Sequence, residues 1–103
     1  MPKYKRTELI LPYPEFLGAI APVKIFTSSE GKRYQVTHMR GHYLHFNRLD
    51  AKTDTPWDIN LEQLYKAYVE LEDFKTASFS KYVHHRHSPG RGLLIHLGLL
   101  GPA

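Results

Sequence analysis

The stretch Lys81–Gly92, KYVHHRHSPGRG, holds the densest group of side chains that could do chemistry, with three histidines and three basic residues. Imidazole nitrogens bind zinc and other transition metals, so a metal site is the first function to consider. On a helix His84 and His87 would share a face while His85 would point elsewhere, and the chain has no cysteine and no HExxH pattern. We therefore expect no metal site and no cofactor.

The same stretch contains the local signals of a helix start. Serine followed by proline at Ser88–Pro89 is typical of the N-cap and first helical positions, and it predicts a helix from Pro89 to about Leu97. The unpaired amides of Gly90–Gly92 at the start of this helix would attract phosphate. In the alternative interpretation the glycines allow close packing and the arginines are solvated. The predicted anion-binding residues of this corner are Lys81, Arg86, His87, Ser88, Gly90 and Arg91.

No pattern in the sequence predicts a catalytic site. The chain has no cysteine nucleophile, no GxSxG motif, no P-loop and no dinucleotide-binding GxGxxG. The acidic pairs Asp50/Asp54 and Asp54/Asp58 are typical of solvated loop charges. We therefore expect no catalytic residues, and a binding protein rather than an enzyme.

Alternating polar and apolar residues predict antiparallel strands over Val23–Thr27, Arg33–Met39 and Tyr43–Leu49, with a short fourth strand over Trp57–Ile59. In this pattern Tyr34, Val36 and His38 share one face of the sheet. The outward face would carry Arg33, Gln35, Thr37, Tyr43, His45 and Asn47, with Arg40 nearby. Arg33 and Arg40 are therefore predicted as further phosphate contacts, beside rings and amides suited to bases.

Asn60, with Gln63 three residues later, has the pattern of a capping box at the start of a helix. A second helix is predicted over Ala77–His85, before the one that begins at Pro89. The predicted fold class is α+β: a small curled antiparallel sheet or SH3-like barrel of three to four strands, followed by three short helices. We expect a single domain over residues 1–103, made of a proline-rich arm (1–22), a β part (23–59) and a helical part (60–100).

The net charge of +4 is unevenly distributed. Residues 53–73 hold six acids and one lysine, whereas residues 74–103 hold four basic residues and no acid. Basic ends of this kind attract phosphates through long-range potential. The lack of cysteine favours a reducing compartment, and no stretch has the apolar length of a signal peptide or a membrane span. We therefore expect a cytoplasmic protein with no membrane partner.

These observations favour a small basic nucleic-acid-binding or nucleic-acid-associated module that contacts phosphates non-specifically. Its partner would be the backbone of DNA or RNA. The alternative is a protein-interaction or accessory subunit without catalytic activity. Its proline-rich arm and apolar C-terminal residues would then contact a protein partner or a second copy of the chain.

Overall fold

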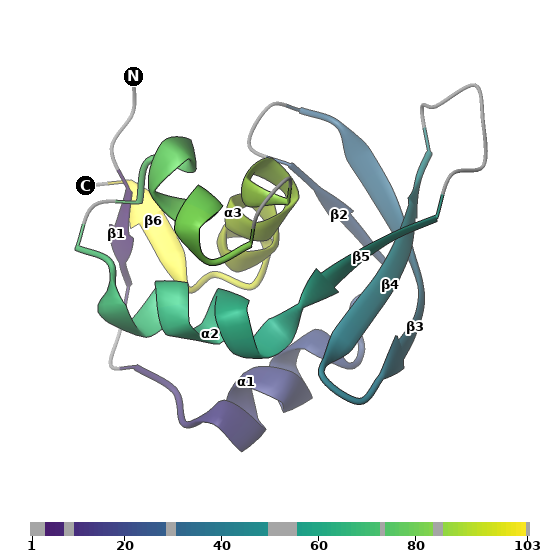
Figure 1. The fold of residues 1–103 in the computed structure, drawn as a ribbon, viewed down its shortest axis with the longest axis horizontal. Coiled ribbons are helices and arrows are strands. Elements are labelled where there is room, and N and C mark those ends of the chain that lie inside the picture. Colours follow the sequence, from purple (N-terminus) through teal and green to yellow (C-terminus); the bar gives the residue numbers. More distant parts are fainter. Residues whose placement is uncertain are drawn as a thin grey trace.

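The computed structural model describes residues 4–7, 10–28, 31–49, 56–72, 74–83 and 86–102. Figure 1 shows the sheet on one side of the molecule and most of the helices on the other. In chain order the elements are β1 (Tyr4–Arg6), α1 (Tyr13–Ile20), β2 (Ile25–Thr27), β3 (Arg33–Arg40), β4 (Tyr43–Arg48), β5 (Pro56–Asn60), α2 (Leu61–Glu70), the 3₁₀ helix η1 (Thr76–Lys81), α3 (His87–His96) and β6 (Leu100–Pro102).

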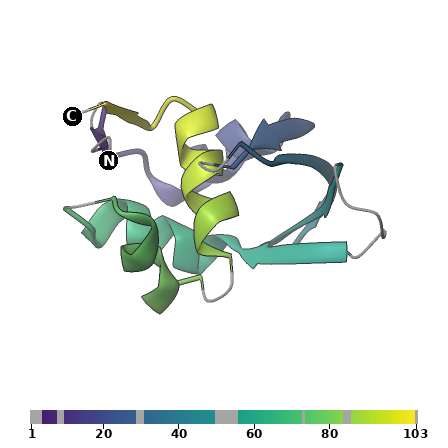
Figure 2. The same cartoon turned by 90° about the horizontal axis from the view of Figure 1, so that it is seen from above.

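The fold is α+β, as the sequence predicts. Strands β2, β3, β4 and β5 form one antiparallel sheet in which each strand pairs with the next along the chain. Among the described residues β2 and β5 do not pair with each other, so this sheet stays open and is not a closed barrel. Strands β1 and β6 form a second, two-stranded sheet, and Figure 2 shows α3 lying between the two sheets.

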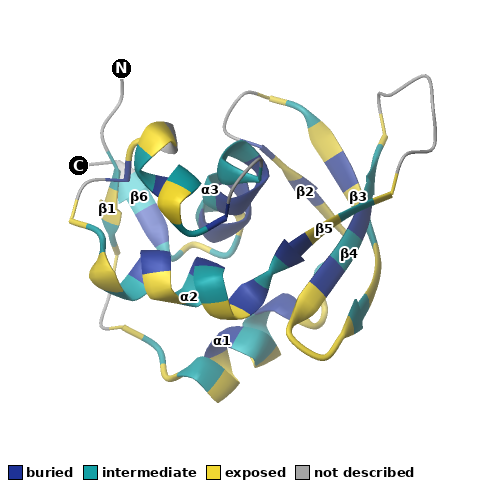
Figure 3. Ribbon diagram, in the orientation of Figure 1, coloured by how far each residue is buried: buried dark blue, intermediate teal, exposed yellow. Residues whose placement is uncertain are grey.

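The core lies between the inner face of the four-stranded sheet and the helices. From the sheet it includes Phe26, Tyr34 and Phe46, whose ring centroids are 5.2–5.4 Å apart. Leu93 and Leu94 of α3 are fully buried in the same cluster. Figure 3 shows the alternation of buried and exposed residues along β3 and β4 that results when only one face of a sheet is covered.

One feature of β3 departs from simple alternation. The pairing register between β3 and β4 shifts between Val36 and His38, which is a β-bulge. Because a bulge adds one unpaired residue, the following side chains exchange faces. The prediction that His38 lies on the face of Val36 is therefore wrong: His38 is exposed and pairs with His45, and Met39 turns inward opposite Leu44.

Helix α2 is held at both ends. At its start the Asn60 Oδ1 accepts hydrogen bonds from the amides of Glu62, at 3.0 Å, and Gln63, at 3.2 Å, which confirms the predicted N-cap. At its end an Arg6 guanidinium nitrogen donates to the carbonyls of Tyr68, at 2.9 Å, and Leu71, at 2.6 Å. A cation is favourable there because the last carbonyls of a helix lack intrahelical partners and carry partial negative charge.

Three elements differ from the expected pattern. The proline-rich arm contains a two-turn helix, α1, whose prolines stand at the N-cap and in the first turn, where no amide hydrogen is needed. The segment predicted as a helix over Ala77–His85 is the shorter η1, and His84 and His85 lie outside the described residues. The pairing of β1 with β6 was not predicted. In the described part of the chain, every helix is too short or too polar to cross a membrane.

Candidate nucleic-acid interface

Helix α3 begins two residues earlier than predicted, so Ser88 and Pro89 stand inside its first turn. Arg86 occupies the N-cap position and makes no side-chain cap hydrogen bond. The amide of Gly90 already donates to the Arg86 carbonyl at 2.9 Å, and the amides of Arg91 and Gly92 lie further into the helix, where they face carbonyls one turn back. The backbone donors expected at Gly90–Gly92 are therefore not available to a phosphate.

The two glycines of α3 are buried and lie against other elements. A Cβ at Gly92 would overlap the Ser28 Cα and the Thr27 carbonyl oxygen, so α3 and the end of β2 approach too closely for any side chain. A Cβ at Gly90 would come within 3.1 Å of a Leu64 methyl group. Close packing therefore accounts for both glycines without a ligand.

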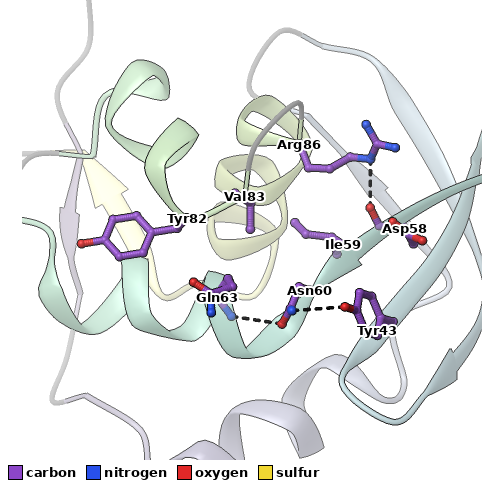
Figure 4. Close-up of a pocket in the computed structure, with 8 residues that line it drawn as sticks. All are labelled: Tyr43, Asp58, Ile59, Asn60, Gln63, Tyr82, Val83 and Arg86. Atoms are coloured by element: carbon purple, nitrogen blue, oxygen red, sulfur yellow. Dashed lines mark hydrogen bonds between the residues drawn. The ribbon is translucent and has the colours of Figure 1, made fainter.

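The arginines of α3 do not converge. Arg86 Nε donates to the Asp58 carbonyl at 2.9 Å, and its guanidinium lies 4.6 Å from the centroid of the Trp57 ring (Figure 4). Arg91 donates instead to the Phe74 carbonyl at 3.1 Å and lies over the tyrosine ring of β1. Each guanidinium is held by a different backbone segment, so the two do not close around a common anion.

The remaining predicted residues are divided between two regions. Lys81 is exposed at the end of η1, and Ser88 is partly buried. His87 is also partly buried, and its Nδ1 has no hydrogen-bond partner in the described part of the chain. Arg33 and Arg40 are exposed near the two ends of β3, on the sheet. The structure thus separates the sheet arginines from the corner at α3.

The outer face of the four-stranded sheet brings basic, amide and ring side chains together. The cross-strand partners place Gln35 beside Asn47, His38 beside His45, and Arg40 beside Tyr43. We define the outer face as Ile25, Thr27, Arg33, Gln35, His38, Arg40, Tyr43, His45, Asn47 and Asp58. His38 is the member that strand alternation assigned to the opposite side.

The histidines at the centre of this face form a stacked pair. The ring centroids of His38 and His45 are 4.3 Å apart, and the ring planes differ by 8°. The Thr37 hydroxyl donates its one hydrogen to the His45 carbonyl at 3.1 Å, so its 3.2 Å contact with His38 Nδ1 requires that nitrogen to be the donor. In a neutral His38 the lone pair is therefore on Nε2.

This stack is a poor metal site for a geometric reason. A metal ion lies in the plane of each imidazole that binds it, and one ion cannot lie in two parallel planes that are stacked on each other. Within the described ranges, no group of three His, Asp or Glu side chains has an arrangement that could hold a metal ion. The pair instead presents flat π surfaces to solvent.

A pocket of about 300 Å³ opens at the β5 edge of the outer face, where the sheet meets the helices (Figure 4). Its apolar part is formed by Ile59 and Val83, both almost fully buried. Gln63 and Tyr82 line it from the helical side. Tyr43 belongs both to the pocket and to the outer face, so the two surfaces are continuous.

Three polar side chains contact one another at the other side of the β3–β4 turn. The Tyr13 hydroxyl is 2.9 Å from His42 Nδ1, and His42 Nε2 is 3.4 Å from the Glu62 carboxylate. Burial, and then the Glu62 charge, raise the pKa of Tyr13 above its ordinary value. These contacts link α1, the β3–β4 turn and α2.

No family model, curated protein or solved structure matches the chain, so its function has to be argued from these surfaces.

Proposed function

We propose that the protein is a small nucleic-acid-binding module that holds single strands of DNA or RNA on the outer face of its sheet, without strong sequence preference. The observation that supports this function is the meeting of two features on one exposed face. Arg33 and Arg40 supply positive charge, and the rings of His38, His45 and Tyr43 supply surfaces on which bases stack. Single-strand-binding proteins combine the same two features.

The layout of the outer face sets a path for the strand. Arg33 and Arg40 are seven positions apart along β3, a distance of roughly 20 Å at ~3.3 Å per residue. The His38–His45 stack lies between these two arginines along the sheet. Asp58, opposite His45 on β5, would repel phosphates. The phosphate backbone is therefore expected over β3 and its β2 side, with bases directed toward β4.

The sheet arginines carry this proposal in place of those in α3. Arg33 and Arg40 stand on either side of the stacked histidines along β3, whereas Arg86 and Arg91 belong to α3 and its N-cap. Arg33 and Arg40 stand on the exposed face itself.

The test is the salt dependence of binding to a fluorescently labelled single strand of mixed sequence. The double variant Arg33→Gln/Arg40→Gln should weaken binding and lower the slope of log affinity against log salt by about 1.4, at ~0.7 for each lost phosphate contact. The matched control is Lys66→Gln/Lys81→Gln, which removes the same charge from exposed positions on α2 and η1. Absent binding, or an equal loss in the control, would overturn the proposal.

Measurements on the same purified protein distinguish this function from the alternative, a protein-interaction subunit. The exposed large apolar side chains are divided among different segments of the chain, which is a weaker basis for a protein interface than one continuous patch. They are Ile10, Ile25, Tyr43 and Leu49. A molar mass that rises with protein concentration, together with no binding to any nucleic acid, would favour self-association.

A further inference from the structure

We infer that the pocket beside β5 receives one unstacked base of the bound strand, and that this base is guanine. The inference rests on the proposed single-strand binding, because the strand would deliver the base. Tyr43 connects the two surfaces: it is 44% exposed on the outer face and also lines the pocket. A strand lying on β3 and β4 therefore passes the mouth of the pocket.

The size of the pocket suits one base. The pocket lies between β5, the start of α2 and the junction of η1 with α3 (Figure 4). Ile59 and Val83 give it an apolar surface, and Tyr82 stands at one side. Its volume of about 300 Å³ is at the lower end of the range for ligand sites, which suits a single ring system.

Two polar side chains at the pocket have hydrogen-bonding capacity to spare. Among the described residues, the Gln63 side chain has no hydrogen-bond partner and the Asp58 carboxylate has no ion pair. Asn60, by contrast, already makes hydrogen bonds: its Oδ1 caps α2 and its Nδ2 donates to the Tyr43 hydroxyl at 3.4 Å. Figure 4 draws the Gln63 amide on the far side of Ile59 and Asn60 from Asp58, so recognition of a base would fall to the Asp58 carboxylate.

The chemistry of the Asp58 carboxylate selects among the bases. An ionised carboxylate only accepts hydrogen bonds, and its two oxygens match a base edge with two adjacent N–H donors. Guanine has such an edge, with its ring N–H and exocyclic amine side by side. Thymine and uracil place a carbonyl on each side of their single N–H, and adenine has a lone pair beside its amine, so a carboxylate is repelled by part of each edge.

The experiment compares all-thymine eleven-nucleotide strands with the same strands carrying one central guanine, adenine or cytosine. The guanine strand should bind about five- to tenfold more tightly than the all-thymine strand, at the low end for a bidentate contact because the pocket is open to water. The measured quantity is the ratio of the affinity for the guanine strand to the affinity for the all-thymine strand. A ratio is needed because Asp58→Asn also removes a negative charge and strengthens binding to every strand. Asp58→Asn should bring the ratio to about one. Glu70→Gln, with the same charge change on the exposed side of α2, should keep the ratio of the unmodified protein.

Each outcome decides between the two proposals. Strand binding that depends on Arg33 and Arg40 but shows no guanine preference, or a preference that survives Asp58→Asn, overturns the pocket assignment and leaves the proposed function standing. If no strand binds, the proposed function fails, and the pocket is then tested alone by titrating guanosine monophosphate into isotope-labelled protein. Amide shifts centred on Gln63 and Val83 would support a guanine site, and unchanged amides there would overturn it.

Discussion

Among the glycines, Gly92 leaves the least room for an added methyl group, at the contact between α3 and β2. At Gly92 an added Cβ would overlap backbone atoms of Thr27 and Ser28, which have no side-chain torsion that could move them aside. The substitution Gly92→Ala must therefore push the whole helix away from the strand. The other two helical glycines, Gly18 and Gly90, provide controls that differ only in the space around them.

The magnitudes follow from two opposing effects. Alanine is favoured over glycine in a helix interior by ~1 kcal/mol. At Gly18 there is nothing within 4 Å of an added Cβ, so Gly18→Ala should stabilise the protein by up to that amount, or about 4–8 °C in melting temperature. At Gly92 an overpacking cost of about 3 kcal/mol or more outweighs the gain, for a net loss of about 2 kcal/mol and roughly 8–16 °C.

Gly90→Ala should fall between these two variants. Its Cβ would meet side-chain methyl groups of Leu64, Ile59 and Val83 at 3.1–3.4 Å, and these can shift by a few tenths of an ångström. The helix propensity gain and the packing cost then nearly cancel, which predicts a stability within about 1 kcal/mol of the unmodified protein. Thermal melts followed by circular dichroism give the order of stability of the three variants, and urea titrations give their free energies of unfolding. A melting temperature of Gly92→Ala equal to or above that of Gly18→Ala would contradict the close approach of α3 to β2.

Three further perturbations test other parts of the structure. Arg86→Met should cost about 1 kcal/mol and shift the fluorescence of Trp57, the only tryptophan, because it removes both a carbonyl hydrogen bond and a cation–π contact. Asn60→Ala should lower the unfolding free energy by ~1 kcal/mol in urea titrations, through loss of the α2 cap. Glu62→Gln should lower the raised pKa of Tyr13, measured by phenolate absorbance. Since folding favours the neutral phenol, the stability that Tyr13 contributes is complete below the pKa of an unfolded tyrosine and is lost as pH rises through the folded pKa.

The parts of the fold that the sequence predicted well are those determined by local pattern. Strands β3 and β4 and the start of α2 follow from alternation and from the Asn60 cap, and each has its cause within about ten residues of chain. The β1–β6 pairing joins three-residue strands nearly a hundred positions apart, so no window of sequence contains its cause. The bulge after Val36 is likewise not predictable from a local stretch of sequence, because it depends on how β3 pairs with β4.

The start of α3 shows that a sequence pattern can correctly predict a helix and still leave its first residue undetermined. Proline is tolerated anywhere in the first turn of a helix, since the amides there have no intrahelical partner. Ser88–Pro89 is therefore compatible with a helix that begins at either Pro89 or His87, and the choice depends on contacts made elsewhere. With the earlier start, the amide of Gly90 becomes an intrahelical donor, and the basis for an anion site at this corner disappears.

The arginines show why net charge is a weak guide to a binding surface. Arg6, Arg86 and Arg91 each donate to a backbone carbonyl and each lie over an aromatic ring, so the fold uses their guanidinium groups internally. In the sequence they are indistinguishable from Arg33 and Arg40, which stand on the outer face. Strand alternation identified Arg33, since the outward side of a half-covered sheet is a local property, whereas Arg40 was expected only near this face, in the turn after the strand. The pocket at β5 could not be identified in this way, because strand, helix start and helix junction come together there only in the folded chain.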